Sequence, residues 1–326
     1  MVPMSNHILL AYGFDGKGGG NVLSHEAISD RIRDDQLAWV HLDANLPETR
    51  TWLEKEIHYL DPFIIEALLT DETRPRMTQI GQGVLLILRG MNSNENALPE
   101  DMVSIRIWVD QHRIISLRRR KLKSISDIEE KLKVGKGPKD AADFLCMLSA
   151  RIFERMEPVL SGLDDATDEV EEKILEAANV ELRESIVSIR KQAIKFRRYL
   201  APQRDAIEQL QVADLEWWTD RHKRYLREVH NHVTRYVEDL DAIRERSQIV
   251  KDEIANMLSD RLNRNMYVLS VIAAIFLPLG FLTGLMGINI GGMPGVDNAG
   301  AFWTFSGVLI VLVVIQVIVF KRLKWF

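Results

Sequence analysis

Two long uncharged runs lie near the end of the chain, after a first part in which charged and apolar residues alternate. Residues 266–286 and residues 302–320 contain no Asp, Glu, Lys or Arg. At about 1.5 Å per residue, each run forms a helix of roughly 30 Å, which matches the hydrocarbon thickness of a bilayer. Neither run has a polar face, which disfavours two buried helices of a water-soluble core. The pattern therefore predicts two transmembrane helices.

The charges that flank the two runs predict their orientation. Three basic residues precede the first run and three follow the second: Lys251, Arg261, Arg264, Lys321, Arg322 and Lys324. The connecting segment, residues 287–301, holds no Lys or Arg and one acid, Asp297. Positive loops stay in the cytosol. We therefore expect both termini in the cytosol, an outer loop at 287–301, and a chain anchored in the inner (plasma) membrane and its lipid.

Residues 1–140 alternate between strand-like and helix-like segments, which predicts a cytosolic α/β domain. The segments expected as strands are 36–42, 84–90, 102–109 and 113–118, and those expected as helices are 25–33, 48–56 and 62–70. The glycine-rich segment 15–21 lacks the Lys-Ser/Thr end of a phosphate loop, so we interpret it as a loop between the first strands.

Residues 141–265 show no strand pattern, which predicts a cytosolic helical stalk or funnel. We expect helices over 142–176 and 180–200, and a third that begins near Thr219 or Asp220 and continues into the membrane. The first helix ends in an acidic run and the second is basic, so antiparallel packing would pair their charges. The acidic run is interpreted either as an electrostatic funnel for cations or as a solvated helix face.

The third helix carries an apolar heptad stripe that needs a partner. Its two core positions are occupied by Leu226, Val233, Leu240 and Ile254, and by Val229, Tyr236, Ile243, Val250 and Met257. A helix of the same chain covers part of such a stripe, and a symmetric oligomer covers the rest.

Composition excludes several classes of function. The net charge of −5 disfavours a nucleic-acid partner, and the single cysteine, Cys146, rules out an intrachain disulfide and a cysteine-caged zinc site. We find no nucleophile–base arrangement, so an enzyme is not expected. The eight histidines are interpreted as surface residues, because His230 and His232 are two positions apart and lie on different helix faces.

A two-span hairpin cannot enclose a pore alone, whereas a ring of first spans can. One face of the first span carries a stripe at steps of three or four: Met266, Leu269, Ala273, Leu277, Gly280 and Gly284. It is bulky at the cytosolic end and small at the outer end, which predicts a hydrophobic neck and a wide mouth. Helix–helix packing is the alternative interpretation. Gly287, Ile288 and Asn289 follow the stripe, and amide oxygens of Asn289 would hold a hydrated divalent cation at the mouth.

The segment FLPLGFLTGLMGIN at 276–289 resembles the signature of the CorA metal-ion transporter family, although Ile288 stands where that signature has Met. The loop at 291–295 and the motifs at 72–76 and 201–205 resemble the zinc-transport (ZntB-type) branch. The resemblance implies a homopentamer with a funnel-shaped cytosolic domain, a central pore and Asn289 at the selectivity mouth. It also implies transport of Zn²⁺, with Cd²⁺, Ni²⁺ and Co²⁺ as further passengers, coupled to protons.

Some parts of this picture stay open at the level of sequence. Neither span holds an Asp, Glu, His, Lys or Arg, so proton coupling would fall to Asp297 or to the stalk acids Asp252, Glu253 and Asp260. Asp252 is either a regulatory metal ligand or a solvated carboxylate. The alternatives to zinc transport are a Mg²⁺ or Co²⁺ channel of the same architecture and a membrane-tethered cytosolic sensor without a pore.

Overall fold

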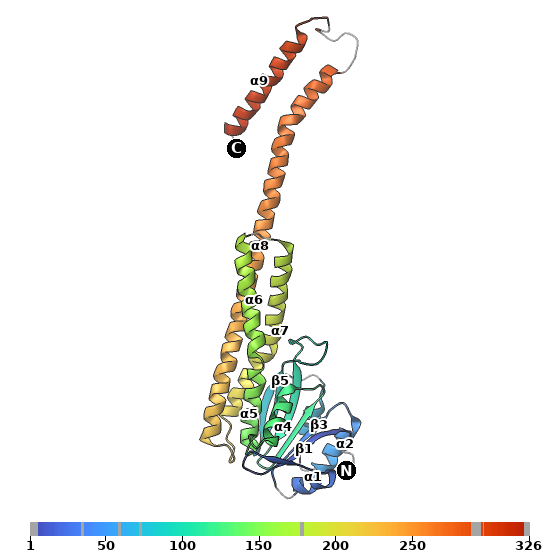
Figure 1. Ribbon diagram of the computed structural model, residues 1–326, viewed down its shortest axis with the longest axis vertical. Helices are drawn as coiled ribbons and strands as arrows, with labels where there is room; N and C mark the ends of the chain where they lie inside the picture. The colour runs from blue at the N-terminus through green and yellow to red at the C-terminus, as the bar shows by residue number, and fades with distance from the viewer. Residues whose placement is uncertain are drawn as a thin grey trace. The chain divides into compact units, whose positions relative to one another are not determined.

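The computed structural model describes residues 6–33, 36–57, 60–71, 74–176, 179–287, 295 and 297–322. The chain divides into two compact units, Met1–Asp252 and Glu253–Phe326. The first unit holds a β-sheet and a group of helices, and the second holds two apolar helical segments (Figure 1).

The described part of the first unit contains one mixed sheet. Its strands are β1 (Ile8–Phe14), β2 (Gly20–Val22), β3 (Ala38–Asp43), β4 (Arg76–Ile80), β5 (Gly83–Gly90), β6 (Val103–Val109) and β7 (Arg113–Arg118). Their order is β2-β1-β3-β7-β6-β5-β4, and β3 and β7 pair in parallel while all other neighbours are antiparallel.

The four predicted strands are confirmed as β3, β5, β6 and β7, whereas β4 was not predicted. The sequence of β4, RMTQI, carries little apolar signal because this edge strand is largely exposed. The segment between β1 and β2 includes Gly16 and Gly18, both with positive φ, so the glycine-rich segment serves as a loop between strands as expected.

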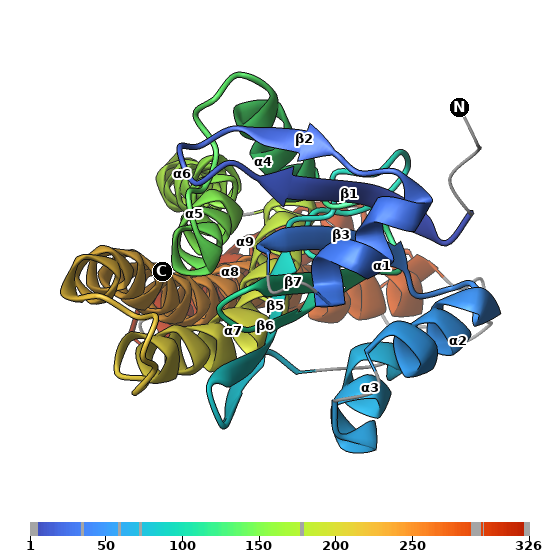
Figure 2. The same ribbon diagram turned by 90° about the horizontal axis from the view of Figure 1, so that it is seen from below.

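Helices cover both faces of the sheet. On one face, α1 (His25–Arg33), α2 (Pro47–Glu56) and α3 (Pro62–Leu69) share a buried apolar cluster with Val40 and Leu42 of β3. On the other face, Trp39 packs against Phe144 of α5 (Ala141–Glu154), with ring centroids 5.0 Å apart. Figure 2 shows α2 and α3 lying apart from α5 and the other long helices. The alternation of side chains along β3 therefore builds a three-layer α/β/α domain.

The remaining helices of this unit are α4 (Lys123–Lys133), α6 (Glu157–Glu176), α7 (Val180–Gln211) and the first part of α8 (Asp220–Gly287). The single helix expected over 142–176 is wrong, because α5 ends at Glu154 and α6 begins at Glu157. Pro158 explains the break, since it cannot donate a backbone hydrogen bond and its ring excludes the preceding helical turn. Helix α7 continues through Pro202, beyond the end expected at residue 200.

The charges of α6 pair with α8, which corrects the expected pairing with α7. Arg246 of α8 donates to Glu171 at 2.6 and 2.9 Å and to Asp164 at 3.0 Å, and it also contacts Asp168. One guanidinium thus bridges three of the six acids, so this part of the acidic run serves as a docking face for α8.

The heptad stripe of α8 is covered within this chain along most of its length. Its buried members are Leu226, Val229, Val233, Leu240, Ile243, Val250 and Ile254. Tyr236 is half-buried, whereas Met257 is 38 % exposed. The stripe therefore needs no partner subunit before its last position.

The second unit contains the last part of α8 and α9 (Ala301–Arg322). An 18-residue stretch of α8 has a mean hydropathy of 2.3 and one of α9 has a mean hydropathy of 2.5. Both helices are long enough to cross a bilayer. The two uncharged runs of the sequence, 266–286 and 302–320, lie inside them.

Candidate functional site

One side of the first span faces α9. Val271 is buried, and Ala274, Ile275, Leu279 and Leu282 are half-buried. These residues follow one another at helical spacing, so they form a single packing face. A face of this kind explains why the two spans stay together as a hairpin.

A polar contact inside this hairpin follows from Pro278. Proline has no backbone N–H, so the carbonyl of Ala274, four residues earlier, loses its helical donor. The side chain of Gln316 in α9 supplies the missing donor, with Nε2 3.3 Å from the Ala274 oxygen. In hydrocarbon an unsatisfied carbonyl costs several kcal/mol, so Gln316 compensates for the proline.

The stripe expected to line a pore lies on the opposite side of the first span. At 100° per residue, the stripe is about half a turn away from the face that packs on α9. Met266 and Leu269 are each 67 % exposed and Leu277 is 72 % exposed, while Ala273, Gly280 and Gly284 are exposed as well. Most of the stripe is therefore not covered by α9, whereas Gly280 lines an open cavity whose other wall includes Leu309 and Val313 of α9.

The glycines of the first span have no packing role within the described chain. A Cβ added to Gly280, Gly284 or Gly287 would meet no described atom within 4 Å beyond the local helix. Small residues in membrane helices permit close approach of another helix. In the described chain, α9 does not come this close to any of the three glycines.

The remaining predicted site residues are Ile288, Asn289, Asp297 and Asp252. Ile288 and Asn289 lie outside the described residues, so their geometry stays a prediction. Asp297 is described and exposed. Asp252 is also exposed; its Oδ2 accepts a hydrogen bond from Gln248 at 2.6 Å, and Lys251 Nζ lies 3.6 Å from its Oδ1.

The interpretation of the histidines as surface residues is wrong for His7, His41 and His222, which are buried. His41 is fully buried beside Ser116, and burial, with Arg118 nearby, lowers its pKa to about 3. His222, at the start of α8, is 4 % exposed and lies between Asp140 and Asp143 at the start of α5. No local spacing predicts this cluster, because His222 lies about 80 positions after Asp140 and Asp143.

Comparison with known proteins identifies the family. A family model described as "CorA-like Mg2+ transporter protein" matches residues 34–322. The chain belongs to the CorA family. The predicted resemblance is therefore confirmed, and with two helices able to cross a bilayer this member of a transporter family is a membrane protein.

Relatives match this member of the CorA family over nearly its whole length. It is 38 % identical over 323 residues to the divalent cation transporter CmaX of Pseudomonas aeruginosa, covering 98 % of this chain and 96 % of that protein. It is 36 % identical over 315 residues to the zinc transport protein ZntB of Pectobacterium atrosepticum, covering 97 % and 95 %. The structure of full-length CmaX covers 100 % of both chains at a TM-score of 0.87 and 36 % identity. Both relatives are named as transporters and neither as an enzyme.

Proposed function

We propose that this protein is a homopentameric zinc transporter in which the first spans of five subunits surround a central pore. The observation that carries the proposal is the exposed stripe of the first span, opposite the face that packs on α9. A ring of five first spans would turn these stripes toward a common axis, with the second spans against lipid. The glycines near the outer end would allow close approach and a wide mouth.

The choice of zinc rests on two supports. One is the 36 % identity to a protein named as a zinc transporter. The other is the chemistry of the outer end, where Asn289 would offer neutral amide oxygens and Asp297 is the only acid of the outer loop. The spans and this loop contain no Cys or His, so zinc binds weakly along the pore, as conduction requires. Cd²⁺, Ni²⁺ and Co²⁺ are further passengers in this proposal.

Proton coupling and orientation complete the proposal. The spans contain no Asp, Glu, His, Lys or Arg between Met266 and Met286 or between Phe302 and Phe320, so protons would be exchanged at Asp297 or at stalk acids such as Asp252. Basic residues precede the first span and follow the second, which supports a cytosolic position for both termini and a location in the inner (plasma) membrane.

A second candidate function is transport of Mg²⁺ or Co²⁺ by the same architecture. The description of the matching family model, which names Mg²⁺, favours it. The two candidates differ in ion selectivity and share the pore.

Metal flux into liposomes tests the proposal. Purified protein is reconstituted, and uptake of Zn²⁺ and of Mg²⁺ is followed with entrapped dyes, with and without a pH gradient. The variant Asn289→Ala removes the amide oxygens at the mouth, and Thr304→Ala in α9 is the matched control outside the stripe. We expect Zn²⁺ uptake that rises with the gradient and falls in Asn289→Ala alone.

Other outcomes reject defined parts of the proposal. Flux that is indifferent to the gradient rejects proton coupling and leaves a passive channel. Flux of Mg²⁺ without Zn²⁺ supports the second candidate. Absence of any metal flux from correctly inserted protein rejects transport and favours a tethered cytosolic sensor.

A further inference from the structure

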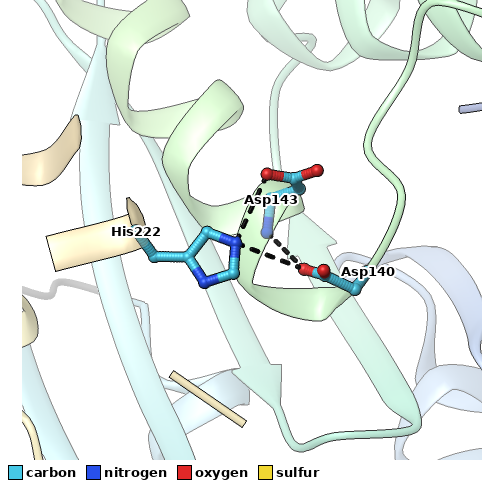
Figure 3. A group of neighbouring side chains, drawn as sticks. All are labelled: Asp140, Asp143 and His222. Atoms are coloured by element: carbon cyan, nitrogen blue, oxygen red, sulfur yellow. Dashed lines mark hydrogen bonds and ion pairs between the residues drawn. The ribbon is translucent and has the colours of Figure 1, made fainter. Parts of the chain in front are cut away.

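A buried histidine and two carboxylates meet where α5 and α8 begin (Figure 3). The Nε2 atom of His222 lies 3.4 Å from Oδ1 of Asp143 and 3.9 Å from Oδ1 of Asp140. One ligand atom from each residue lies within 4.8 Å of the other two. The three side chains point toward one another (Figure 3). All three residues come before the membrane spans in the sequence.

The spacing of these atoms suits a metal ion better than a hydrogen bond. Good N–H···O hydrogen bonds are about 2.7–3.2 Å long, so both contacts of Nε2 are longer than that range. Zinc bonds of about 2.0–2.2 Å in tetrahedral geometry separate neighbouring ligand atoms by roughly 3.3–3.6 Å. The 3.4 Å separation of His222 and Asp143 falls within this range, whereas Asp140, at 3.9 Å from Nε2, must move closer to bind the same ion.

The surroundings prepare His222 to act as a ligand. Its Nδ1 accepts a hydrogen bond from the backbone N–H of Thr219 at 3.3 Å and lies 3.0 Å from the Thr219 hydroxyl, so the Nε2 position faces the two carboxylates and a metal ion would replace the proton there. These contacts of Nδ1 fix the orientation of the ring. The ring of Trp218 lies 5.6 Å from the imidazole and limits its rotation. Asp140 is 55 % exposed, which gives an ion a path from solvent.

We propose that His222, Asp143 and Asp140 form a cytosolic binding site for a divalent transition-metal ion, with water completing the coordination. The imidazole selects Zn²⁺, Co²⁺ or Ni²⁺ over Mg²⁺, which prefers oxygen ligands alone. Zinc as the ion in the cell rests on the proposed function. A metal ion at this site links α5 to α8. His222 supplies the nitrogen ligand that the spans and the outer loop lack.

Arg221 provides an internal competitor for the metal. Its Nη2 lies 3.2 Å from Oδ1 of Asp143, the same oxygen that faces His222. The Arg221 side chain is 68 % exposed, so it can swing into solvent when an ion binds. Removal of Arg221 therefore leaves the carboxylate free for the metal.

Equilibrium binding to the full-length protein in detergent tests the site. Metal is removed with a chelator, and Zn²⁺ and Mg²⁺ are added separately. Asp140→Asn is the main variant, because Asn caps α5 as well as Asp does but lacks the charge. His222→Gln removes the nitrogen ligand, and His230→Gln is the matched control on the same helix.

We expect one class of Zn²⁺ sites to weaken at least ten-fold in Asp140→Asn and His222→Gln, to tighten in Arg221→Gln, and to stay unchanged in His230→Gln. Co²⁺ bound at this site should give a visible absorption band that His222→Gln removes. Unchanged Zn²⁺ affinity in Asp140→Asn and in Arg221→Gln would overturn the proposal and leave a structural ion pair. If His222→Gln does not fold, the Zn²⁺ affinity of Asp140→Asn still tests the proposed site.

The outcome of the binding test is independent of the outcome of the flux test. Loss of the binding difference while Zn²⁺ flux persists rejects this site and keeps the proposed transport. Absence of Zn²⁺ flux with intact, variant-sensitive binding rejects the transport proposal and keeps the site.

Discussion

The hydrogen bond from Gln316 to the carbonyl that Pro278 leaves without a helical donor should stabilise the membrane hairpin. Replacing Gln316 by Leu removes the donor found 3.3 Å from the Ala274 oxygen. Side-chain hydrogen bonds between membrane helices contribute about 0.6–1.7 kcal/mol. This range corresponds to a change of about 3- to 16-fold in the equilibrium between the closed and the separated hairpin.

A double-mutant cycle isolates this contribution. Pro278→Ala restores a backbone N–H that donates to Ala274, so Gln316→Leu should cost about 1 kcal/mol with Pro278 present and close to nothing in the Pro278→Ala background. The control Ser306→Val makes another polar-to-apolar change in α9.

Energy transfer between dyes reports the separation of the spans. The dyes are placed at the ends of α8 and α9 in a protein freed of Cys146, the only cysteine, and SDS is added to mixed micelles. An equal cost of Gln316→Leu in both backgrounds would refute the compensation of Pro278 by Gln316.

Two further predictions concern charges in the first unit. Arg246→Gln should lower the free energy of unfolding by about 1–2 kcal/mol, because it removes ion pairs that are only partly exposed. Thermal unfolding at low salt and in 1 M NaCl measures this loss, and a loss of stability that salt does not reduce would contradict the prediction. Burial alone would raise the pKa of Asp127, but hydrogen bonds from Arg155 and Arg151 hold that pKa below its usual value. The contribution of Asp127 to stability is thus present above about pH 4 and is lost as pH falls through its lowered pKa. The free energies of unfolding of wild type and Asp127→Asn should therefore converge in acid. A difference between these free energies that stays constant down to about pH 2 would contradict the prediction.

Much of the fold was predictable because its signals are local. Strand β5 contains a continuous apolar run, and β3, β6 and β7 are mostly apolar; such segments are typical of strands buried on both faces. Strand β4 escaped prediction because an exposed edge strand needs no apolar pattern. The break between α5 and α6 carried a local signal in Pro158, and a helix over 142–176 ignored it.

The candidate sites divide in the same way. The stripe of the first span follows from helical period alone, so Met266, Leu269 and their neighbours could be placed on one face without a structure. The cluster of Asp140, Asp143 and His222 could not be found, because no local spacing connects α5 with the start of α8. Its geometry depends on how these two helices pack.

The sequence by itself determined the two membrane spans, their order, the apolar stripe and the family signature at 276–289. These features depend on neighbouring residues and on helical period, so local chemistry suffices. Only the tertiary structure decided that Arg246 pairs with three acids of α6, that Gln316 donates to the carbonyl of Ala274, and that His222 meets two carboxylates. Each of these contacts joins residues more than 40 positions apart, and such a pair is chosen by the packing of whole elements.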